Sequence, residues 1–281
     1  MEKKQKKYIF PETLAEASEL LKGENVLMIS GGTTFKFRNL KNFSRIVDIS
    51  RVAPDSIKIN DKEIILGSMV RIGRLLENKS LRELNCGILA SAASNIASTP
   101  IRNQITLGGN LTMIYRWTDL PVSILVLAAE IRTVNGNESM TYTAEDFFAS
   151  NPSRKLARGE IVKELIIPVH DNDYLLLFKT FNKTKGDFAA INMAAGYKLG
   201  DVFSDLRIAI SAISNLPVRL KALERDLEGS RKDEKVVVDA IAKHLPNFKV
   251  SDFRYNSEYL NQVAKVMLKR LLLVEDREAE L

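Results

Sequence analysis

The sequence predicts an α+β protein whose C-terminal part is an antiparallel sheet covered by helices. Three observations favour this fold class. Upstream of residue 170, short apolar runs of strand length are mixed with amphipathic segments of helix length. Downstream of residue 173, strand-like segments come first and helix-like segments follow, which is typical of segregated layers. The length of 281 residues also allows two domains, each large enough to bury a core.

The first elements follow from apolar periodicity and from glycine. Residues 12–22 predict a helix with one apolar face, and Gly23 ends it. The run VLMIS at 26–30 predicts a buried strand that enters a tight turn at Gly31-Gly32. Further strands are predicted over 45–50 and 63–68, with an exposed hairpin arm between them, and helices over 71–84 and 87–98.

The middle of the chain is less regular. Residues 99–120 have little periodicity and many Gly, Asn and Thr residues, so we expect an ordered loop. Residues 121–135 predict a buried helix that runs into a strand, and 163–169 predict another strand. The polar break HDND at 170–173 is the predicted boundary between a domain at 1–172, with subdomains at about 1–55 and 56–172, and a domain at 173–281.

The C-terminal domain is predicted to consist of strands followed by helices. The segments YLLLFKTF and AAINMAAGYKL have the pattern of paired strands, and RIAISAIS follows as a third. The remaining apolar periodicity is helical. The predicted strands are 174–181, 189–199 and 207–214, and the predicted helices are 220–229, 235–245 and 257–281.

Composition excludes several classes of function. The net charge of +6 owes much to a lysine run at residues 3–7, and no nucleic-acid-binding motif accompanies it, so a solvated tail is favoured. There is no apolar signal segment and no run long enough to span a bilayer. We therefore expect a soluble, cytoplasmic protein that binds neither nucleic acid nor membrane.

Cysteine and histidine are scarce. Cys86 is the only cysteine, and His170 and His244 are the only histidines. A zinc site or an iron–sulfur cluster needs about four such ligands close together, so any metal chemistry must belong to a partner. We expect Cys86 to be a small buried hydrophobic residue and His170 to be a surface residue without a partner.

Two glycine pairs are the chemically informative feature. Gly31-Gly32 and Gly108-Gly109 each follow an apolar segment, and hydroxyl or amide side chains follow each pair. Because glycine lacks a Cβ, its amide can approach a phosphate oxygen closely, and successive amides form an anion site. Neither pair matches the G-x-G-x-x-G fingerprint or the P-loop. Each alone is more often a bare turn; together they could grip a pyrophosphate from two sides.

The residues around both pairs form a longer pattern. It runs from SGGTT at 30–34 through IRN at 101–103 and TLGGN at 106–110 to TDL at 118–120. This pattern resembles A-G-G-T-D, I-R-N, T-I-G-G-N and S-D-L in the FAD-binding subunit of the molybdenum hydroxylases, the group of xanthine dehydrogenase and carbon monoxide dehydrogenase. The resemblance continues through residues 47–50, 65–76 and 178–199 and covers about residues 8–275.

The resemblance implies a two-subdomain FAD-binding domain with a fold like that of vanillyl-alcohol oxidase, followed by a C-terminal domain like that of carbon monoxide dehydrogenase flavoproteins. It implies that both glycine turns hold the pyrophosphate, that Asp119 contacts the ADP half, and that Lys179 lies near the flavin. The implied FAD-binding residues are Ile29, Ser30, Gly31, Gly32, Thr33, Thr34, Phe35, Ile96, Arg102, Thr106, Gly108, Gly109, Asn110, Thr118, Asp119, Val162 and Lys179.

Some positions depart from the family pattern or allow a second interpretation. Thr34 and Ser30 replace the usual Asp and Ala of the first turn. Arg102 could contact phosphate or could cap a local helix. Asp119 could contact the cofactor, could be the N-cap of the next helix, or both. Aromatic side chains such as Phe188 and Tyr197 could shield the flavin, although an aromatic residue in a strand is more often core.

The functional hypothesis is an electron-transfer subunit with FAD as its cofactor and with no catalytic acid or base of its own. In this hypothesis a molybdopterin subunit oxidises the substrate, a [2Fe-2S] subunit relays electrons, and the FAD passes them to NAD or another acceptor. The alternatives are a stand-alone FAD oxidoreductase and a non-enzymatic nucleotide-binding module with a decayed flavin site. The substrate and the final acceptor stay open.

Overall fold

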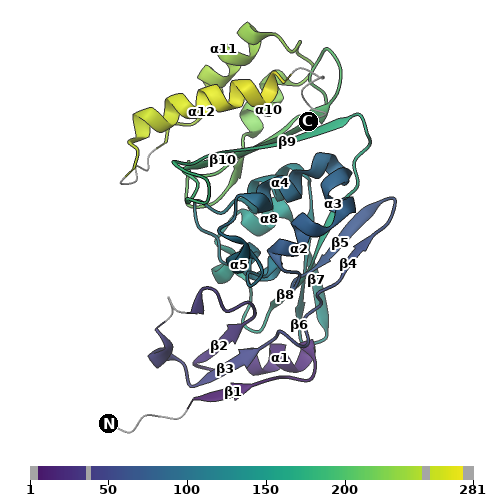
Figure 1. Ribbon diagram of the computed structural model, residues 1–281, viewed down its shortest axis with the longest axis vertical. Coiled ribbons are helices and arrows are strands. Elements are labelled where there is room, and N and C mark those ends of the chain that lie inside the picture. The colour runs from purple at the N-terminus through teal and green to yellow at the C-terminus, as the bar shows by residue number, and fades with distance from the viewer. Residues whose placement is uncertain (1–5, 36–38, 249–253, 275–281) are drawn as a thin grey trace. The chain divides into compact units, whose positions relative to one another are not determined.

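The structure is a computed structural model that describes residues 6–35, 39–248 and 254–274 (Figure 1). The chain divides into two compact units, each assembled from three stretches. Unit 1 comprises Met1–Arg74, Ser98–Met113 and Glu130–Ile167, and unit 2 comprises Leu75–Ala97, Ile114–Ala129 and Pro168–Leu281. The predicted boundary at residue 172 stays a prediction, because the units interleave along the chain.

Unit 1 begins with a small parallel sheet in the order β1-β3-β2 and one helix. The predicted helix is confirmed as α1, Leu14–Leu21, whose N-cap Thr13 accepts a hydrogen bond from the Glu16 amide at 3.0 Å. Ala17 of α1 is fully buried and packs with Val47 and Ile161 in one hydrophobic core. The strands are β1 (Lys7–Ile9), β2 (Val26–Ile29) and β3 (Arg45–Asp48), and the 3-10 helix η2 (Leu40–Asn42) precedes β3.

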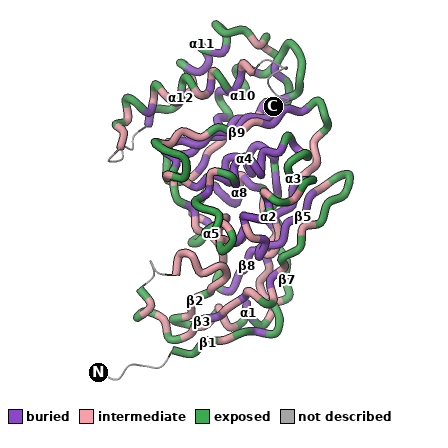
Figure 2. The backbone as a smooth tube through the Cα atoms, viewed as in Figure 1, coloured by how far each residue is buried: buried purple, intermediate pink, exposed green. Residues whose placement is uncertain are grey.

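The strand β2 differs from its prediction in one respect. It forms and enters the turn at Gly31 as expected, but its residues are only half-buried or exposed. The physical reason is its place at an edge of the three-stranded sheet, with a partner strand on one side only. In Figure 2 the tube through β1, the other edge strand, is mainly green.

Unit 1 also holds a five-stranded sheet in the order β4-β5-β8-β6-β7. The hairpin arm expected before residue 63 is confirmed, since β4 pairs with β5 in antiparallel fashion. Strand β8 lies in the middle of this sheet and is mostly buried. The elements are β4 (Ile57–Ile59), β5 (Glu63–Gly67), β6 (Glu130–Asn135), β7 (Glu138–Thr143) and β8 (Ile161–Pro168), with helices α2 (Ile72–Glu77), α8 (Ala144–Phe148) and α9 (Pro152–Lys155).

The stretch predicted as an ordered loop, residues 99–120, contains two short helices. They are α5 (Thr99–Arg102) and α6 (Leu107–Thr112). The absence of helical periodicity was misleading, because a helix of four to six residues is too short to show it. The start of α6 is fixed instead by its N-cap Thr106, whose hydroxyl accepts a hydrogen bond from the Gly109 amide at 3.2 Å. The glycine pair 108–109 is therefore the first turn of a helix.

Unit 2 contains the antiparallel sheet β12-β11-β10-β9 with helices packed on it, which confirms the predicted α+β class. Ile191, Met193 and Ala195 of β10 point into a core shared with the helices, so the intervening residues face the other side of the sheet. In Figure 2 the tube through this sheet is largely purple. The strands are β9 (Tyr174–Phe181), β10 (Ile191–Lys198), β11 (Arg207–Ile210) and β12 (Val218–Arg219).

The C-terminal helices of unit 2 match their predicted positions, whereas the single helix predicted over 71–84 is divided into α2 and α3, with Asn78 as the N-cap of α3. The last predicted helix is α12, which ends at Leu272, and residues 275–281 of that prediction lie outside the described residues. Helix α7 is buried along its whole length. The helices are α3 (Lys79–Glu83), η3 (Leu84–Gly87), α4 (Ile88–Ser94), α7 (Leu120–Val126), α10 (Lys221–Leu227), α11 (Glu234–His244) and α12 (Ser257–Leu272).

The expectation that Cys86 is buried is wrong. Asn85 and Cys86 both adopt left-handed backbone conformations, with φ of 52° and 51°, inside η3. Cys86 is exposed, although its Sγ atom lies 3.6 Å from the Tyr174 carbonyl oxygen, while Asn85 is buried. The conformation reverses the burial that residue type alone predicts.

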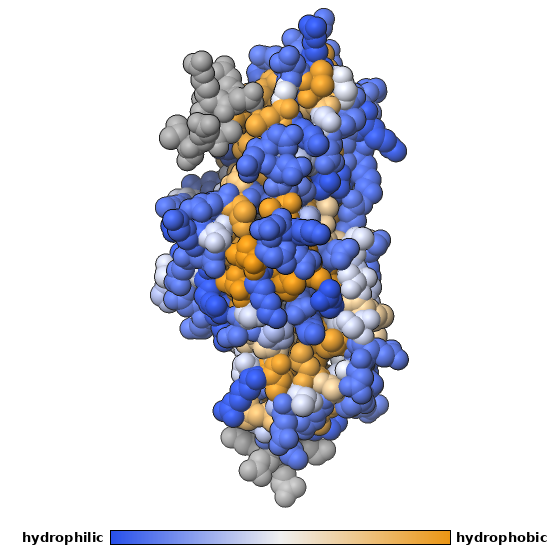
Figure 3. Space-filling model, turned by 90° about the vertical axis from the view of Figure 1, so that its right-hand side faces the viewer, coloured by the Kyte–Doolittle hydropathy of each residue, from blue (hydrophilic) through white to orange (hydrophobic). Residues whose placement is uncertain are grey.

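The described surface mixes polar and apolar side chains. Figure 3 shows one face, on which hydrophilic side chains surround smaller apolar areas. Among the described residues, no helix combines the length and apolar character needed to cross a membrane. The same residues include no group of three or more His, Cys, Asp or Glu side chains placed to hold a metal ion.

Candidate functional site

The two glycine turns meet in unit 1. Ser30 follows β2, and Thr106 precedes α6, yet the Ser30 Oγ and Thr106 Oγ1 atoms lie 3.1 Å apart, at hydrogen-bonding distance. Thr106 is buried, so this contact joins the two turns inside the unit. The structure thus brings together two motifs that the sequence separates widely.

Glycine is required in this region because backbone atoms approach closely. A Cβ added at Gly31 would lie 2.1 Å from the carbonyl oxygen of Gln104, and one added at Gly108 would lie 2.8 Å from the Ser68 Cβ. Gly32 has φ of +71°, a left-handed conformation that favours glycine. The packing around the two turns therefore leaves no room for a side chain at Gly31 or at Gly108.

The two turns differ in their amides. In the described part of the chain, the amides of residues 31–34 donate to no protein acceptor. The amides of the second turn are already used: those of Gly108 and Asn110 donate to Ser68 O and Thr106 O, and that of Gly109 donates to Thr106 Oγ1. The expectation that both turns offer amides is thus met by the first turn only.

The second turn offers side chains instead. The Oδ1 atom of Asn110 is buried and accepts no hydrogen bond from any described residue. A buried amide oxygen without a donor is costly, and a hydroxyl group of a ligand would satisfy it. Open amides from residues 31–34, two glycines without space for a Cβ, and this oxygen fit the pyrophosphate and the adjoining hydroxyl groups of FAD.

Asp119 lies in unit 2 and is a buried carboxyl group. It occupies the N-cap position of α7, as one interpretation predicted, but its side chain makes no capping hydrogen bond. It is only 8% exposed, and burial raises the pKa of its carboxyl group to about 7, despite hydrogen bonds from its own backbone and from Asn192. The neighbouring Thr118 closes the preceding turn, since its hydroxyl accepts a hydrogen bond from the Tyr115 amide at 2.9 Å.

The other predicted site residues are scattered over both units. Ile96 and Val162 are buried, as expected for apolar contacts. The Arg102 Nη2 atom donates to the Thr99 hydroxyl within α5, at 2.9 Å. Lys179 is exposed on β9, and strand alternation places it on the opposite face of the sheet from Asn192. The structure therefore does not bring Lys179 beside Asp119.

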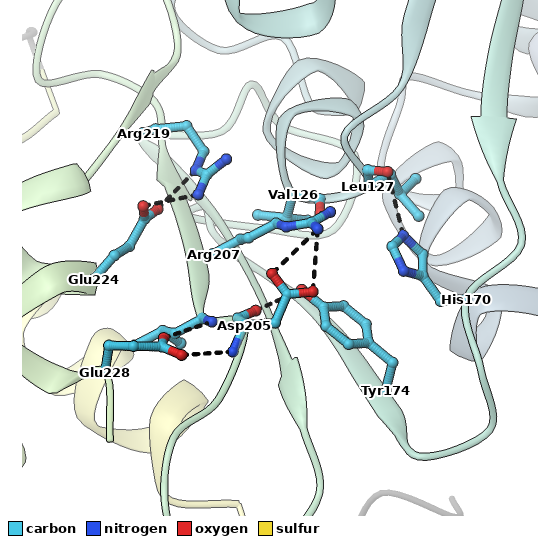
Figure 4. Close-up of polar contacts among 10 residues, drawn as sticks. Val126, Leu127, His170, Tyr174, Asp205, Arg207, Arg219, Glu224 and Glu228 are labelled. Atoms are coloured by element: carbon cyan, nitrogen blue, oxygen red, sulfur yellow. Dashed lines mark hydrogen bonds and ion pairs between the residues drawn. The ribbon is translucent and has the colours of Figure 1, made fainter. Parts of the chain in front are cut away.

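Helix α7 is held at its C-terminal end by cationic and aromatic side chains of unit 2 (Figure 4). The Arg207 Nη1 atom donates to Val126 O, and the His170 Nε2 atom lies 3.3 Å from Leu127 O. These are last-turn carbonyls, which have no partner within a helix. The prediction that His170 lacks a partner is wrong, since its ring also stacks on Tyr174 at 4.5 Å.

A buried ion pair lies beside the antiparallel sheet of unit 2 (Figure 4). The Arg219 guanidinium donates to both carboxylate oxygens of Glu224, at 2.7 and 2.8 Å, and the Ile208 amide donates to the same carboxylate. Glu228 accepts hydrogen bonds from the amides of Asp205 and Leu206. Together these contacts fix the ends of β11 and β12.

An aromatic stack lies on the loop before Asp119. The rings of Tyr115 and Trp117 are parallel with centroids 5.0 Å apart, and Phe188 lies 5.0 Å from Trp117. Phe188 is 63% exposed, so it is available to a planar ligand, whereas Tyr197 is buried among the helices of unit 2. Tyr197 is thus a core residue, and of the two aromatic candidates only Phe188 is exposed.

Asn192 is the residue that sequence reasoning missed. It lies on β10, is fully buried, and donates from Nδ2 to the carbonyl oxygen of Trp117 at 3.3 Å. The signal was present: a single amide side chain stands in the otherwise apolar strand INMAAG. A polar residue at such a position has a specific partner in the fold.

Relatives of this chain are subunits of dehydrogenases and hydroxylases. The glyceraldehyde dehydrogenase medium chain of Sulfolobus acidocaldarius is 27% identical over 268 residues, covering 92% of this chain and 94% of that protein. The carbon monoxide dehydrogenase medium chain of Hydrogenophaga pseudoflava is 23% identical, covering 94% of this chain and 95% of that protein. These relatives are aligned over nearly their full lengths.

Solved structures share the fold. Quinoline 2-oxidoreductase from Pseudomonas putida 86 superposes with a TM-score of 0.86 at 23% identity, over 100% of this chain and 99% of that one. Carbon monoxide dehydrogenase from Hydrogenophaga pseudoflava superposes with a TM-score of 0.83 at 24% identity, over 95% of both chains.

Two protein families match the sequence directly. The family described as the CO dehydrogenase flavoprotein C-terminal domain matches residues 177–274. The family described as the FAD binding domain in molybdopterin dehydrogenase matches residues 3–170, more than half of the chain. The chain therefore belongs to the FAD-binding subunits of the molybdenum hydroxylases, the xanthine dehydrogenase and carbon monoxide dehydrogenase group of oxidoreductases, and its cofactor is FAD.

Proposed function

We propose that this chain is the electron-transfer subunit of a complex in which a [2Fe-2S] subunit delivers electrons to its FAD. In this proposal a molybdopterin subunit oxidises the substrate, and the FAD passes the electrons to NAD or to another acceptor. FAD supplies the chemistry of taking up electrons singly and releasing them as a pair. Several relatives are named as one chain of a larger enzyme, either as a medium chain or, for caffeine dehydrogenase, as subunit beta. These names support such a division of labour.

The residues that hold FAD are also part of the proposal. The open amides of residues 31–34 donate to the pyrophosphate, and Thr106 and Asn110 bound the same cradle from the second turn. Asp119, as a carboxylate, accepts hydrogen bonds from ribose hydroxyls or from the adenine amino group. The remaining proposed FAD-binding residues follow the family pattern. They are Ile29, Phe35, Ile96, Arg102, Gly108, Gly109, Thr118, Val162 and Lys179.

The need for a partner follows from the ligand count. One cysteine and two histidines in the whole sequence are too few for an iron–sulfur cluster. A molybdenum centre transfers electrons to a flavin over a distance, so a relay with its own cluster is required between them. The proposal therefore includes an iron–sulfur subunit and a molybdopterin subunit as partners.

The observation that carries the proposal is the meeting of the two glycine turns. The 3.1 Å contact between Ser30 Oγ and Thr106 Oγ1 converts two separate bends into one cradle beside four open amides.

The test is purification of the tagged chain from its host as the intact complex. We expect one FAD per chain, together with stoichiometric iron, acid-labile sulfide and molybdenum in co-purifying chains. In a stopped-flow experiment, substrate should bleach the [2Fe-2S] and flavin absorbance, and the flavin should reoxidise when NAD or a quinone is added. A chain that purifies alone and turns over a substrate by itself would contradict the proposal in favour of a stand-alone oxidoreductase.

A further inference from the structure

The loop before α7 is attached to the antiparallel sheet of unit 2 through one side chain. Asn192 is 0% exposed, and its Nδ2 atom donates to Trp117 O at 3.3 Å. The same side chain lowers the pKa of the Asp119 carboxyl group, which burial raises. Trp117 and Asp119 lie two residues apart on one turn, so the bond to Trp117 O fixes the backbone that carries this carboxyl group.

Asn192 itself is held rigidly. Its backbone amide donates to the Ser211 hydroxyl at 2.8 Å, and its carbonyl oxygen accepts from the Ser211 amide at 2.9 Å. Its neighbour across the sheet is Thr180 on β9. A side chain on a strand whose backbone amide and carbonyl are both hydrogen-bonded positions its partners more accurately than one on a loop.

One polar atom of the Asn192 side chain has no hydrogen-bond partner among the described residues. Its Oδ1 atom is buried and accepts no hydrogen bond from the described residues. Hydrogen-bond donors on a ligand beside Asp119, such as ribose hydroxyls, would satisfy it. This second observation points to a ligand and not only to a structural bond.

Within the described residues, the charged side chains on β11 and β12, two strands packed on α7, are engaged with other groups. Arg207 on β11 is bonded to Val126 O and paired with Asp205, and Arg219 on β12 is paired with Glu224. Burial, the backbone of Asp119 and the Asn192 side chain set the pKa of the Asp119 carboxyl group. Asn192 is therefore the side chain through which the sheet acts on this carboxyl group.

We propose that Asn192 is a positioning residue for the cofactor: it holds the Asp119 carboxyl group and the Trp117 backbone in the geometry that receives the adenosine half of FAD. This inference rests on the proposed role of Asp119. It makes binding of the adenosine half depend on the antiparallel sheet that carries Asn192.

The test measures FAD dissociation constants of the full chain by quenching of flavin fluorescence between pH 5.5 and 8.5. Asn192→Leu keeps the size of the side chain and removes the donors, and we expect roughly tenfold weaker binding at pH 8. We also expect the pH at which affinity is half lost to move upward, because the carboxylate has lost a donor. A merely structural role would lower the melting temperature without moving that pH.

A double-mutant cycle shows whether Asn192 acts through Asp119. In an Asp119→Asn background, Asn192→Leu should change the FAD affinity by less than about twofold, because the group that it positions is gone. Thr180→Val is the matched control: it removes a buried hydroxyl that lacks a partner on the adjacent strand, and FAD affinity should stay unchanged. If Asn192→Leu does not fold, Asn192→Asp, which keeps the shape, should show the same upward shift of that pH.

The outcomes separate this inference from the proposed function. If the wild-type chain binds no FAD, the function fails. If the wild-type chain binds FAD and Asn192→Leu keeps the wild-type affinity and pH profile, the positioning role of Asn192 is wrong while the function stands. Additive effects of Asn192→Leu and Asp119→Asn would also overturn it, since they would mean that Asn192 acts independently of Asp119.

Discussion

The glycine cradle of unit 1 and the Asp119–Asn192 region of unit 2 differ in the chemical groups that each presents. The cradle presents backbone amides, and the glycines at 31 and 108 allow turn to pack on turn. The Asp119–Asn192 region presents a buried carboxyl group held by a buried amide. Backbone amides do not titrate, whereas a carboxyl group with a pKa of about 7 does. A ligand bound by the cradle should therefore be held independently of pH, whereas a ligand bound by Asp119 should be held in a way that depends on the protonation of this carboxyl group.

The largest effect is expected in the antiparallel sheet of unit 2, which carries Asn192. Arg219→Met leaves the Glu224 carboxylate buried with only the Ile208 amide as a donor, so the free energy of unfolding should fall by about 3–5 kcal/mol. Chemical denaturation monitored by circular dichroism measures this change. The double variant Arg219→Met/Glu224→Met should recover most of the loss. An Arg219→Met protein as stable as the wild type would show that the pair is not buried as described.

The cradle is broken most directly at Gly31. Gly31→Val places a Cβ 2.1 Å from Gln104 O, so the two turns must separate, and FAD affinity should fall by more than about a hundredfold. Gly23→Ala is the control, because its Cβ meets mainly the flexible end of the Arg45 side chain. Fluorescence titration compares both. Equal FAD affinities for wild type and Gly31→Val would place the cofactor elsewhere.

The pH dependence distinguishes the two regions. The pKa of the Asp119 carboxyl group in the folded protein, about 7, lies above its ordinary value of 3.8, so the folded apoprotein binds more protons than the unfolded chain between those values. Its free energy of unfolding should therefore fall by about 2–3 kcal/mol as the pH rises from 5 to 7. Binding of FAD to the carboxylate should have the opposite sign and strengthen over the same range.

Asp119→Asn tests this assignment. The substitution should remove that component of the pH dependence from both the stability of the apoprotein and the affinity for FAD. Thermal unfolding and fluorescence titration at pH 5, 6, 7 and 8 measure the two quantities. A wild-type and a variant protein with parallel pH profiles would assign the titration to another group.

The smallest effect is expected at the contact between the turns. Ser30→Ala removes the hydrogen bond to Thr106 and keeps the backbone amides, so FAD affinity should fall by about threefold to tenfold. Thr106→Val removes the same bond and also the N-cap of α6, so it should cost more, by about 1 kcal/mol in stability. An equal stability for the two variants would argue against the capping role of Thr106.

The elements with strong periodicity could be predicted from the sequence, and short or irregular ones could not. Helix α1 and the paired strands β9 and β10 follow from apolar spacing over eight or more residues. Helices α5 and α6 do not, because four to six residues give too little pattern and the glycine pair favours a loop. The exposure of Cys86 depends on two left-handed residues that no propensity predicts.

The candidate site, too, could be predicted from the sequence only in part. The cradle could be found because its glycines and hydroxyls are contiguous in the sequence. The second region could be found only in part: Asp119 belongs to a motif, but Asn192 lies more than seventy residues away and no local pattern connects them. The contact of His170 with the Leu127 carbonyl oxygen was missed for that reason as well, since the two residues lie far apart in the sequence. Long-range side-chain contacts were invisible to local motifs.

The most direct test of the account is the FAD content and affinity of the purified full chain at pH 8. The account predicts a yellow protein with one FAD per chain, or an apoprotein that regains one FAD and its visible flavin spectrum on reconstitution, with loss of both in Gly31→Val. A wild-type chain that is folded, colourless and unable to take up FAD would contradict the account, because the cradle and the buried carboxyl group would then have no ligand in common.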